Sequence, residues 1–139
     1  MSSRAIFRWC MVGAALIIGG VALYFLMAYV TAAIAIANSG LKPFYQQAAR
    51  AMWIGYCAQL GVLAAVLLYA AAVPRGISRQ AVIVLALMPA ISTVNLFWSA
   101  ASRAGAVCLG IAAALMVVGA LFWPRPAPPL SPPEDLPAA

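Results

Sequence analysis

Four long runs of residues without a charge divide this chain, and they constrain its fold more than any other feature. They predict helices over residues 9–37, 51–73, 81–101 and 104–123. A helix needs about 20 apolar residues to cross a hydrocarbon core about 30 Å thick, and each run meets that length. A buried strand is only about 4–8 residues long, so strands do not explain the runs. The sequence therefore predicts an all-α protein with four membrane-spanning helices.

The composition excludes a water-soluble alternative. Hydrophobic residues make up 67% of the 139 residues and charged residues only 7%, whereas a soluble domain carries about 25% charged residues. A domain of this size still exposes about a third of its surface, and in water that surface must be wettable. We therefore expect residues 1–123 to form one membrane domain, an integral membrane four-helix bundle surrounded by the lipid bilayer.

The net charge of +6 does not indicate a nucleic-acid partner. Phosphate-binding surfaces need basic residues clustered on one face, and here the basic residues stand singly or in pairs at the ends of the apolar runs. This distribution is typical of membrane topology. The eight basic residues are Arg4, Arg8, Lys42, Arg50, Arg75, Arg79, Arg103 and Arg125.

Turn-forming residues separate most of the runs. Proline cannot continue a helix, and glycine suits the position just past a helix end. The break between the third and fourth runs holds only small residues and Arg103, which predicts a tight hairpin. These short breaks predict an up-down-up-down order of helices. The turn residues are Asn38-Ser39-Gly40 with Lys42-Pro43 after the first run, Pro74-Arg75-Gly76 after the second, and Pro124-Arg125-Pro126 after the fourth.

The positions of Lys and Arg predict the orientation in the membrane. Cytoplasmic loops carry an excess of basic residues. With the N-terminus inside, five basic residues lie on the cytoplasmic side and three on the outer side, so both chain ends are predicted to be cytoplasmic. The inner set is Arg4, Arg8, Arg75, Arg79 and Arg125, and the outer set is Lys42, Arg50 and Arg103.

A cleaved signal peptide is an alternative interpretation of the first run. Arg4 and Arg8 precede it, and Ala35-Ile36-Ala37 resembles a cleavage site. The apolar region of a signal peptide is about 7–15 residues long, however, and this run is about twice that length. A retained helix is therefore favoured.

Residues 124–139 differ from the rest of the chain. Seven of these sixteen residues are proline, and Glu134 and Asp135 are the only acidic residues in the sequence. Such a composition cannot build a core, so we expect a disordered, solvated cytoplasmic tail. Pro126 to Pro129 also fits a P-x-x-P ligand of an aromatic groove, as a less favoured alternative.

The residue types needed for most catalysis are missing from the predicted helices. The sequence has no histidine, and residues 1–123 contain no Asp or Glu. General acid–base catalysis, proton-coupled transport and metal binding draw mainly on these residues. We therefore predict no enzymatic activity, no cofactor and no metal site. Cys10, Cys57 and Cys108 are expected to act as small hydrophobic residues, with a Cys57–Cys108 disulfide as the alternative.

The main polar feature within the membrane is a stripe on the third predicted helix. Ser92, Asn95, Ser99 and Ser102 recur at helical spacing, so they share one face. Pro89 lies in the middle of the same helix and is predicted to kink it, because proline cannot donate to the carbonyl of Leu85. The stripe fits either a packing contact between helices or the wall of a solute pathway.

Gln59 is the other uncharged polar side chain at depth, on the second predicted helix. Counted from the outer ends of their helices, Gln59 and Asn95 lie at depths that agree to within about 2 Å. The sequence therefore predicts that the two side chains meet, directly or through a water molecule. The candidate intramembrane polar cluster is Gln59, Ser92, Asn95 and Ser99.

Small residues four positions apart are frequent in the other helices, as in Ala51-x-x-x-Gly55 and Gly61-x-x-x-Ala65. Such pairs allow helices in membranes to approach closely. With the lack of reactive groups, they favour a non-enzymatic protein that acts through helix–helix association, as a homo-oligomer or with a membrane protein partner. The alternative is an oligomeric channel or facilitator for a small neutral or anionic solute, which would use the polar face of the third helix.

The segment Arg50-Ala-Met-Trp-Ile-Gly55 opens the second predicted helix, and Pro74-Arg75 closes it. In this layout the chain resembles several families of small four-helix bacterial inner-membrane proteins of unknown function. The heavy use of Ala, and of Arg over Lys, is similar to proteins from high-GC bacteria. The resemblance implies a multi-pass protein of the bacterial inner (plasma) membrane, and it implies no particular activity.

Overall fold

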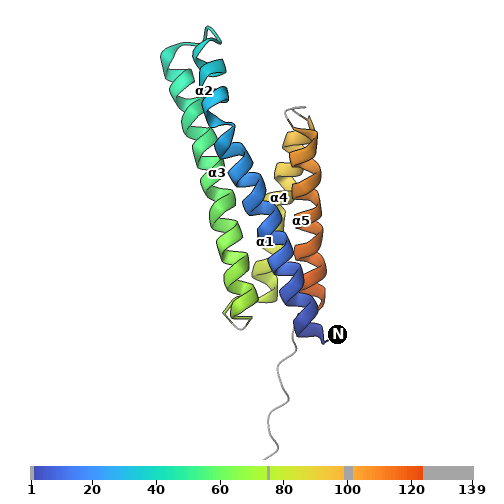
Figure 1. The fold of residues 1–139 in the computed structure, drawn as a ribbon. Coiled ribbons are helices and arrows are strands. Elements are labelled where there is room, and N and C mark those ends of the chain that lie inside the picture. The colour runs from blue at the N-terminus through green and yellow to red at the C-terminus, as the bar shows by residue number, and fades with distance from the viewer. Residues whose placement is uncertain (1, 75, 99–101, 124–139) are drawn as a thin grey trace, which may run out of the picture.

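A computed structural model of the chain describes residues 2–74, 76–98 and 102–123. All regular elements in these residues are helices, as predicted (Figure 1). Four helices are long and apolar enough to span a membrane, which confirms the number of predicted spans. The helices are α1 (Ser3–Met27), α2 (Tyr29–Ala37), α3 (Pro43–Ala72), α4 (Arg79–Trp98) and α5 (Arg103–Leu121).

The prediction of one unbroken helix over residues 9–37 is wrong at Ala28, where α1 ends and the short helix α2 follows. The indole nitrogen of Trp53, on α3, donates a hydrogen bond to the backbone oxygen of Phe25 at 2.9 Å. In an unbroken helix that oxygen would accept from the N–H of Tyr29. A side chain inserted into the backbone ladder bends or interrupts a helix, and this contact accounts for the break.

The predicted start of the second helix at residue 51 is eight residues late, because α3 begins at Pro43. Proline is favourable at the first position of a helix, where its missing N–H would have no partner. The additional turns carry Gln46 and Arg50, whose polar side chains are unfavourable inside a membrane when they have no partner. Both side chains instead donate to backbone oxygens of α2 and the loop that follows it.

The remaining helix ends, apart from the start of α1, lie close to their predicted positions. Gly40, between α2 and α3, has a φ of 70°, the left-handed conformation that glycine tolerates best. The side chain of Ser2 caps α1, which begins at Ser3 and so earlier than the predicted residue 9. The side chain of Ser102 caps α5 by accepting from Gly105 at 3.1 Å. The predicted end of the third helix at residue 101 and the tail 124–139 lie outside the described residues.

The long helices pack in the spatial order α3, α1, α5, α4. Helix α1 contacts both α3 and α5, and α5 also contacts α4, while α3 and α4 hardly touch each other (Figure 1). The buried core therefore follows α1, α5 and the inner face of α3. Helix α4 contributes only three buried residues, which are Val82, Ala86 and Pro89.

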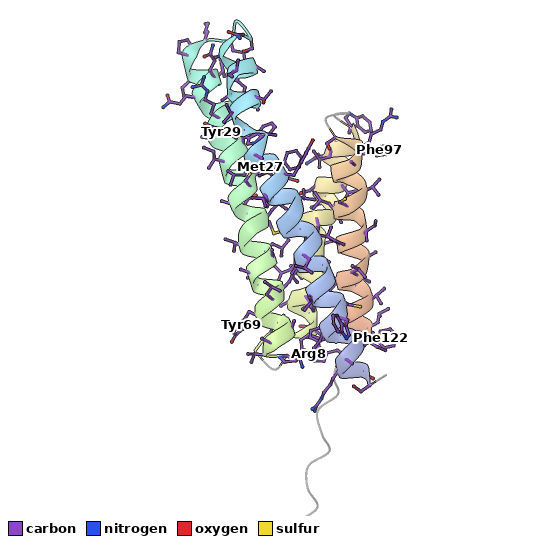
Figure 2. The ribbon with its side chains drawn as sticks, viewed as in Figure 1. Arg8, Met27, Tyr29, Tyr69, Phe97 and Phe122 are labelled. Carbon is purple, nitrogen blue, oxygen red and sulfur yellow. The ribbon has the colours of Figure 1, made fainter. Side chains whose placement is uncertain are left out.

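The hairpin of α2 and the first turns of α3 extends beyond the end of the α4–α5 pair (Figure 1). At 1.5 Å per residue, α3 with its 30 residues is about 45 Å long and α4 with its 20 is about 30 Å long. Phe97, near the end of α4, lies level with Met27 and Tyr29, and α2 continues past that level (Figure 2). Helix α4 thus matches the thickness of a single hydrocarbon core, whereas α3 exceeds it.

Candidate functional site: the groove between α3 and α4

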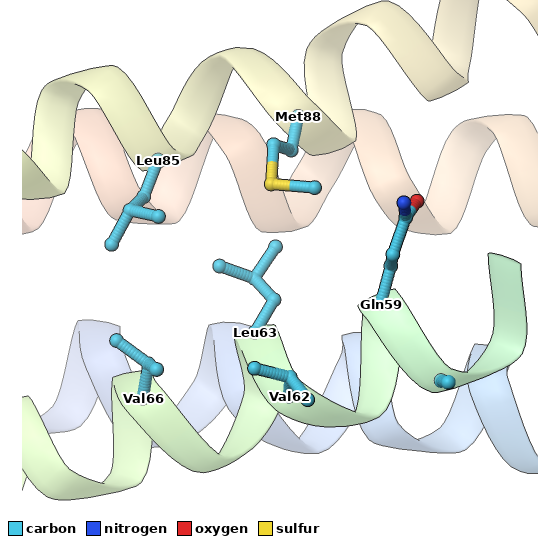
Figure 3. Close-up of a pocket in the computed structure, with 7 residues that line it drawn as sticks. Gln59, Val62, Leu63, Val66, Leu85 and Met88 are labelled. Atoms are coloured by element: carbon cyan, nitrogen blue, oxygen red, sulfur yellow. The ribbon is translucent and has the colours of Figure 1, made fainter. Parts of the chain in front are cut away.

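Between α3 and α4 lies a groove with a volume of about 300 Å³. Leu85 faces Val66 across it, and Met88 faces Leu63 (Figure 3). The groove is open rather than enclosed, since the side chain of Met88 is 40% exposed. Its walls are almost entirely aliphatic. The residues that line it are Ala58, Gln59, Val62, Leu63, Val66, Leu85 and Met88.

Gln59 is the polar member of this lining. Its carboxamide points away from α3 toward the α4 side of the groove (Figure 3). The side chain is exposed, and it forms no hydrogen bond within the described part of the chain. A carboxamide can donate two hydrogen bonds and accept two, so Gln59 brings an unused donor and acceptor set to an apolar surface.

The predicted polar stripe continues the α4 wall of the same groove. Successive positions three or four residues apart share a helix face, and this rule places Ser92 and Asn95 on the face that carries Leu85 and Met88. Ser92 is half-buried and Asn95 is exposed. Neither side chain has a hydrogen-bond partner among the described residues. Ser99 lies outside those residues.

The direct hydrogen bond predicted between Gln59 and Asn95 is not formed among the described residues. Helices α3 and α4 run in opposite directions, and Met88 faces Leu63 (Figure 3). A step of four residues toward the end of α4 and toward the start of α3 therefore brings Ser92 level with Gln59. Asn95 lies about 4.5 Å beyond that level. In addition, α3 packs on α1 and α4 packs on α5, so the groove separates the two side chains.

Pro89 and Thr93 lie on the inner side of α4, next to the polar stripe and toward α5. Pro89 is buried, and α4 continues through it as one helix. The hydroxyl of Thr93 donates to the backbone oxygen of Pro89 at 2.8 Å, and its methyl group faces Gly110 of α5. The contact between α4 and α5 thus uses a different face from the polar stripe. The kink at Pro89 remains a prediction.

The three cysteines are free thiols in the structure. Cys57 is buried on α3, whereas Cys108 is half-buried on α5. Helix α1 packs against both α3 and α5 and lies between them, and the Cys57–Cys108 disulfide is not formed. No three metal-ligating side chains come together in the described ranges.

A second polar feature, which the sequence interpretation missed, joins α3 to the end of α1, to α2 and to the loop after α2. Gln46, Arg50 and Trp53 recur at helical spacing and all donate to backbone oxygens on the preceding segment. Gln46 bonds to Leu41 at 2.9 Å, Arg50 to Ala33 at 3.3 Å and Trp53 to Phe25 at 2.9 Å. The spacing of three strong donors was the available signal. It was not recognised because their partners are main-chain atoms.

Two polar atoms near this feature are buried without a partner in the described residues: Nε of Arg50 and the hydroxyl of Tyr56. The ring of Tyr56 packs edge-on against Phe25, with centroids 5.9 Å apart, and Trp53 packs on the same ring at 5.8 Å. The aromatic cluster therefore anchors α3 at the break between α1 and α2. Its role is structural.

No protein-family model, curated protein or solved structure matches this chain. The geometry of the α3–α4 groove is therefore the basis for assigning a function.

Proposed function

We propose that this chain is a non-enzymatic integral membrane protein that works by helix–helix association, with itself or with a membrane protein partner. The observation that carries the proposal is the open groove between α3 and α4, with Gln59 in its lining and Ser92 and Asn95 on the continuation of its α4 wall. A polar side chain without a partner is costly in hydrocarbon. An associated helix that offers donors and acceptors at this depth removes that cost.

The proposal includes the topology of the chain in its membrane. We propose an up-down-up-down four-helix bundle in a bacterial inner membrane, with both ends in the cytoplasm. The five-to-three distribution of basic residues supports this orientation. Arg8 and Tyr69 lie toward the same end of the molecule as Phe122 (Figure 2), as expected for a cytoplasmic interface with a basic and aromatic border.

Photo-crosslinking in native membranes, followed by mass spectrometry, tests the association. Lys42 is the only lysine, so reagents for amines are unsuitable, and a photoreactive residue in place of Val62 is the better probe. Val62 lines the groove and is 64% exposed. We expect a discrete protein adduct from this position. The control position is Ile111, on the exposed face of α5. Lipid adducts alone, from both positions, would contradict the proposed function.

A channel or facilitator for a small neutral or anionic solute is the second candidate function. The observation that favours it is the stripe of Ser92 and Asn95 along an open groove, which an oligomer could close into a path. The test is solute flux into liposomes that contain the purified protein. For a facilitator, Asn95→Leu lowers the flux. A flux that Asn95→Leu leaves unchanged removes this candidate and leaves association.

A further inference from the structure

The arginines at one end of the bundle have no counter-charge in its helices. Helix α1 begins, α3 ends and α4 begins at this end (Figure 1), which carries Arg4 and Arg8 on α1 and Arg79 on α4. All three side chains are exposed, and none forms a hydrogen bond or ion pair within the described residues. Residues 1–123 contain no Asp or Glu, so the bundle has no acidic side chain with which to pair them.

Arg4 and Arg8 also lie where they repel each other. They are four residues apart on α1, so their Cβ atoms are about 5–6 Å apart on one helix face, and like charges at this spacing destabilise a helix. A cation is favourable in the last turn of a helix, but both arginines lie in the first two turns of α1. An anion that lies between the two side chains removes this repulsion.

Aromatic side chains place the arginines at the level of the lipid headgroups. Trp9 follows Arg8 directly and is 68% exposed, and Tyr69 and Phe122 lie toward the same end of the molecule as Arg8 (Figure 2). Trp and Tyr are enriched where the hydrocarbon of a bilayer meets its headgroups. The two arginines of α1 are therefore level with the phosphate groups of the surrounding lipids.

A phosphate group matches a pair of arginines in geometry as well as in charge. The guanidinium group presents its N–H donors in a planar fork, which binds phosphate oxygens in pairs. A zwitterionic phospholipid carries a cation beside its phosphate, so it leaves the net charge of this end uncompensated. An anionic phospholipid compensates it, and each basic side chain near a membrane surface strengthens the attraction to such lipids about fivefold.

We propose that this end of the bundle binds an anionic phospholipid, with the phosphate held between Arg4 and Arg8 and with Arg79 adding to the attraction. None of the three arginines lines the groove between α3 and α4. The lipid site is therefore separate from the surface of the proposed function, and either one can fail without the other.

Native mass spectrometry of the full chain in detergent tests the site, because it counts the lipids that stay bound. Phosphatidylglycerol is compared with phosphatidylcholine that carries the same acyl chains, and phosphatidylglycerol is expected to bind more tightly. Arg8→Gln is expected to weaken its binding about fivefold, and Arg4→Gln combined with Arg8→Gln about 25-fold. Binding of phosphatidylcholine should not change in either variant, which also shows that the variants are folded.

Arg103→Gln is the matched control, because Arg103 is an exposed arginine at the start of α5, at the opposite end of the bundle. Its replacement should leave the affinity for phosphatidylglycerol unchanged. Arg4→Lys combined with Arg8→Lys keeps both charges but loses the planar forks, so its affinity should lie between those of the unmodified chain and the double Gln variant.

Three results would overturn the inference. Equal affinity for the two lipids would mean that the headgroup charge is not recognised. A loss in Arg103→Gln as large as that in Arg8→Gln would mean that any exposed arginine attracts the lipid. Displacement of phosphatidylglycerol by an equal concentration of inorganic phosphate would mean that the arginines take a free anion and not a lipid.

Discussion

The interface of α1 with α5 and the groove between α3 and α4 are made from the same kinds of residue, yet one is closed and the other is open. At the α1–α5 interface, Met11 and Met116 are fully buried. At the groove, Met88 is 40% exposed and Val62 is 64% exposed. Composition does not explain the contrast. The closed interface places small residues opposite large ones, and the groove places aliphatic side chains opposite each other.

This contrast follows from the solvent. In a bilayer the lipid chains are as apolar as leucine, so no hydrophobic force closes a gap between two helices, and close van der Waals packing has to do so. Gly119 lets α5 approach Met11 and Cys10 of α1. The groove has no equivalent across its width, since Leu85 and Met88 face Val66 and Leu63 (Figure 3).

The largest effect is expected from shortening a methionine of the closed interface. Met116→Ala removes side-chain atoms that have no exposed surface and leaves a cavity, so we expect it to lower the free energy of unfolding by about 2 kcal/mol, the low end of the range for core methionines. The low end applies because the transfer of apolar atoms out of water contributes little within a bilayer. Unfolding of the purified protein by a denaturing detergent measures this change.

Met88→Ala is the matched control for that experiment, with the same chemistry on the groove wall. We expect it to change the free energy of unfolding by less than about 0.5 kcal/mol, as exposed substitutions usually do. Equal losses from the two variants would mean that the groove is closed within one copy, and would erase the distinction between the two regions.

A smaller effect is expected from adding bulk to the closed interface. In Gly119→Val, the new Cβ would lie 3.0 Å from Cβ of Cys10, which belongs to a rigid part of α1. Overpacking of this kind is expected to cost about 1–2 kcal/mol, measured as a lower midpoint of thermal unfolding in detergent. Gly61→Val, with nothing within 4 Å of the new Cβ, should leave the midpoint unchanged. A drop for Gly61→Val would show that the side of α3 at Gly61 is covered within the monomer.

The number of long helices was predictable from the lengths of the four uncharged runs alone, because each run had to cross the same hydrocarbon thickness. The ends were predictable where local chemistry decides them, as at Gly40 and at Pro74. The start of α3 at Pro43 was not predictable in this way, because Arg50 was interpreted as the boundary of the membrane. In the structure Arg50 bonds to the backbone of Ala33. With this partner the cation lies within α3 and does not mark where the helix starts.

The candidate site was predictable in its residues but not in its geometry. Helical spacing on one helix identifies the face shared by Ser92 and Asn95, and the structure places Gln59 on the opposite wall of the same groove. Periodicity says nothing about which helices touch. The separation of Gln59 from Asn95 follows from the order α3, α1, α5, α4, which depends on contacts between residues far apart in the sequence, such as Gly119 with Met11.

The smallest effect is expected at the junction of α1 and α2, which neither the closed interface nor the groove includes. Trp53→Phe removes the hydrogen bond to the Phe25 oxygen but keeps an aromatic ring against Phe25. We expect a cost of about 0.5–1.5 kcal/mol, the net value of one hydrogen bond. The freed oxygen can then accept from the N–H of Tyr29, so α1 and α2 should join into one helix. Hydrogen exchange at Tyr29 measures this directly, because slower exchange in the variant means a restored backbone bond. Unchanged exchange at Tyr29 would show that the break at Ala28 has a cause other than Trp53, and would leave the packing of α1 against α3 as the remaining explanation for it.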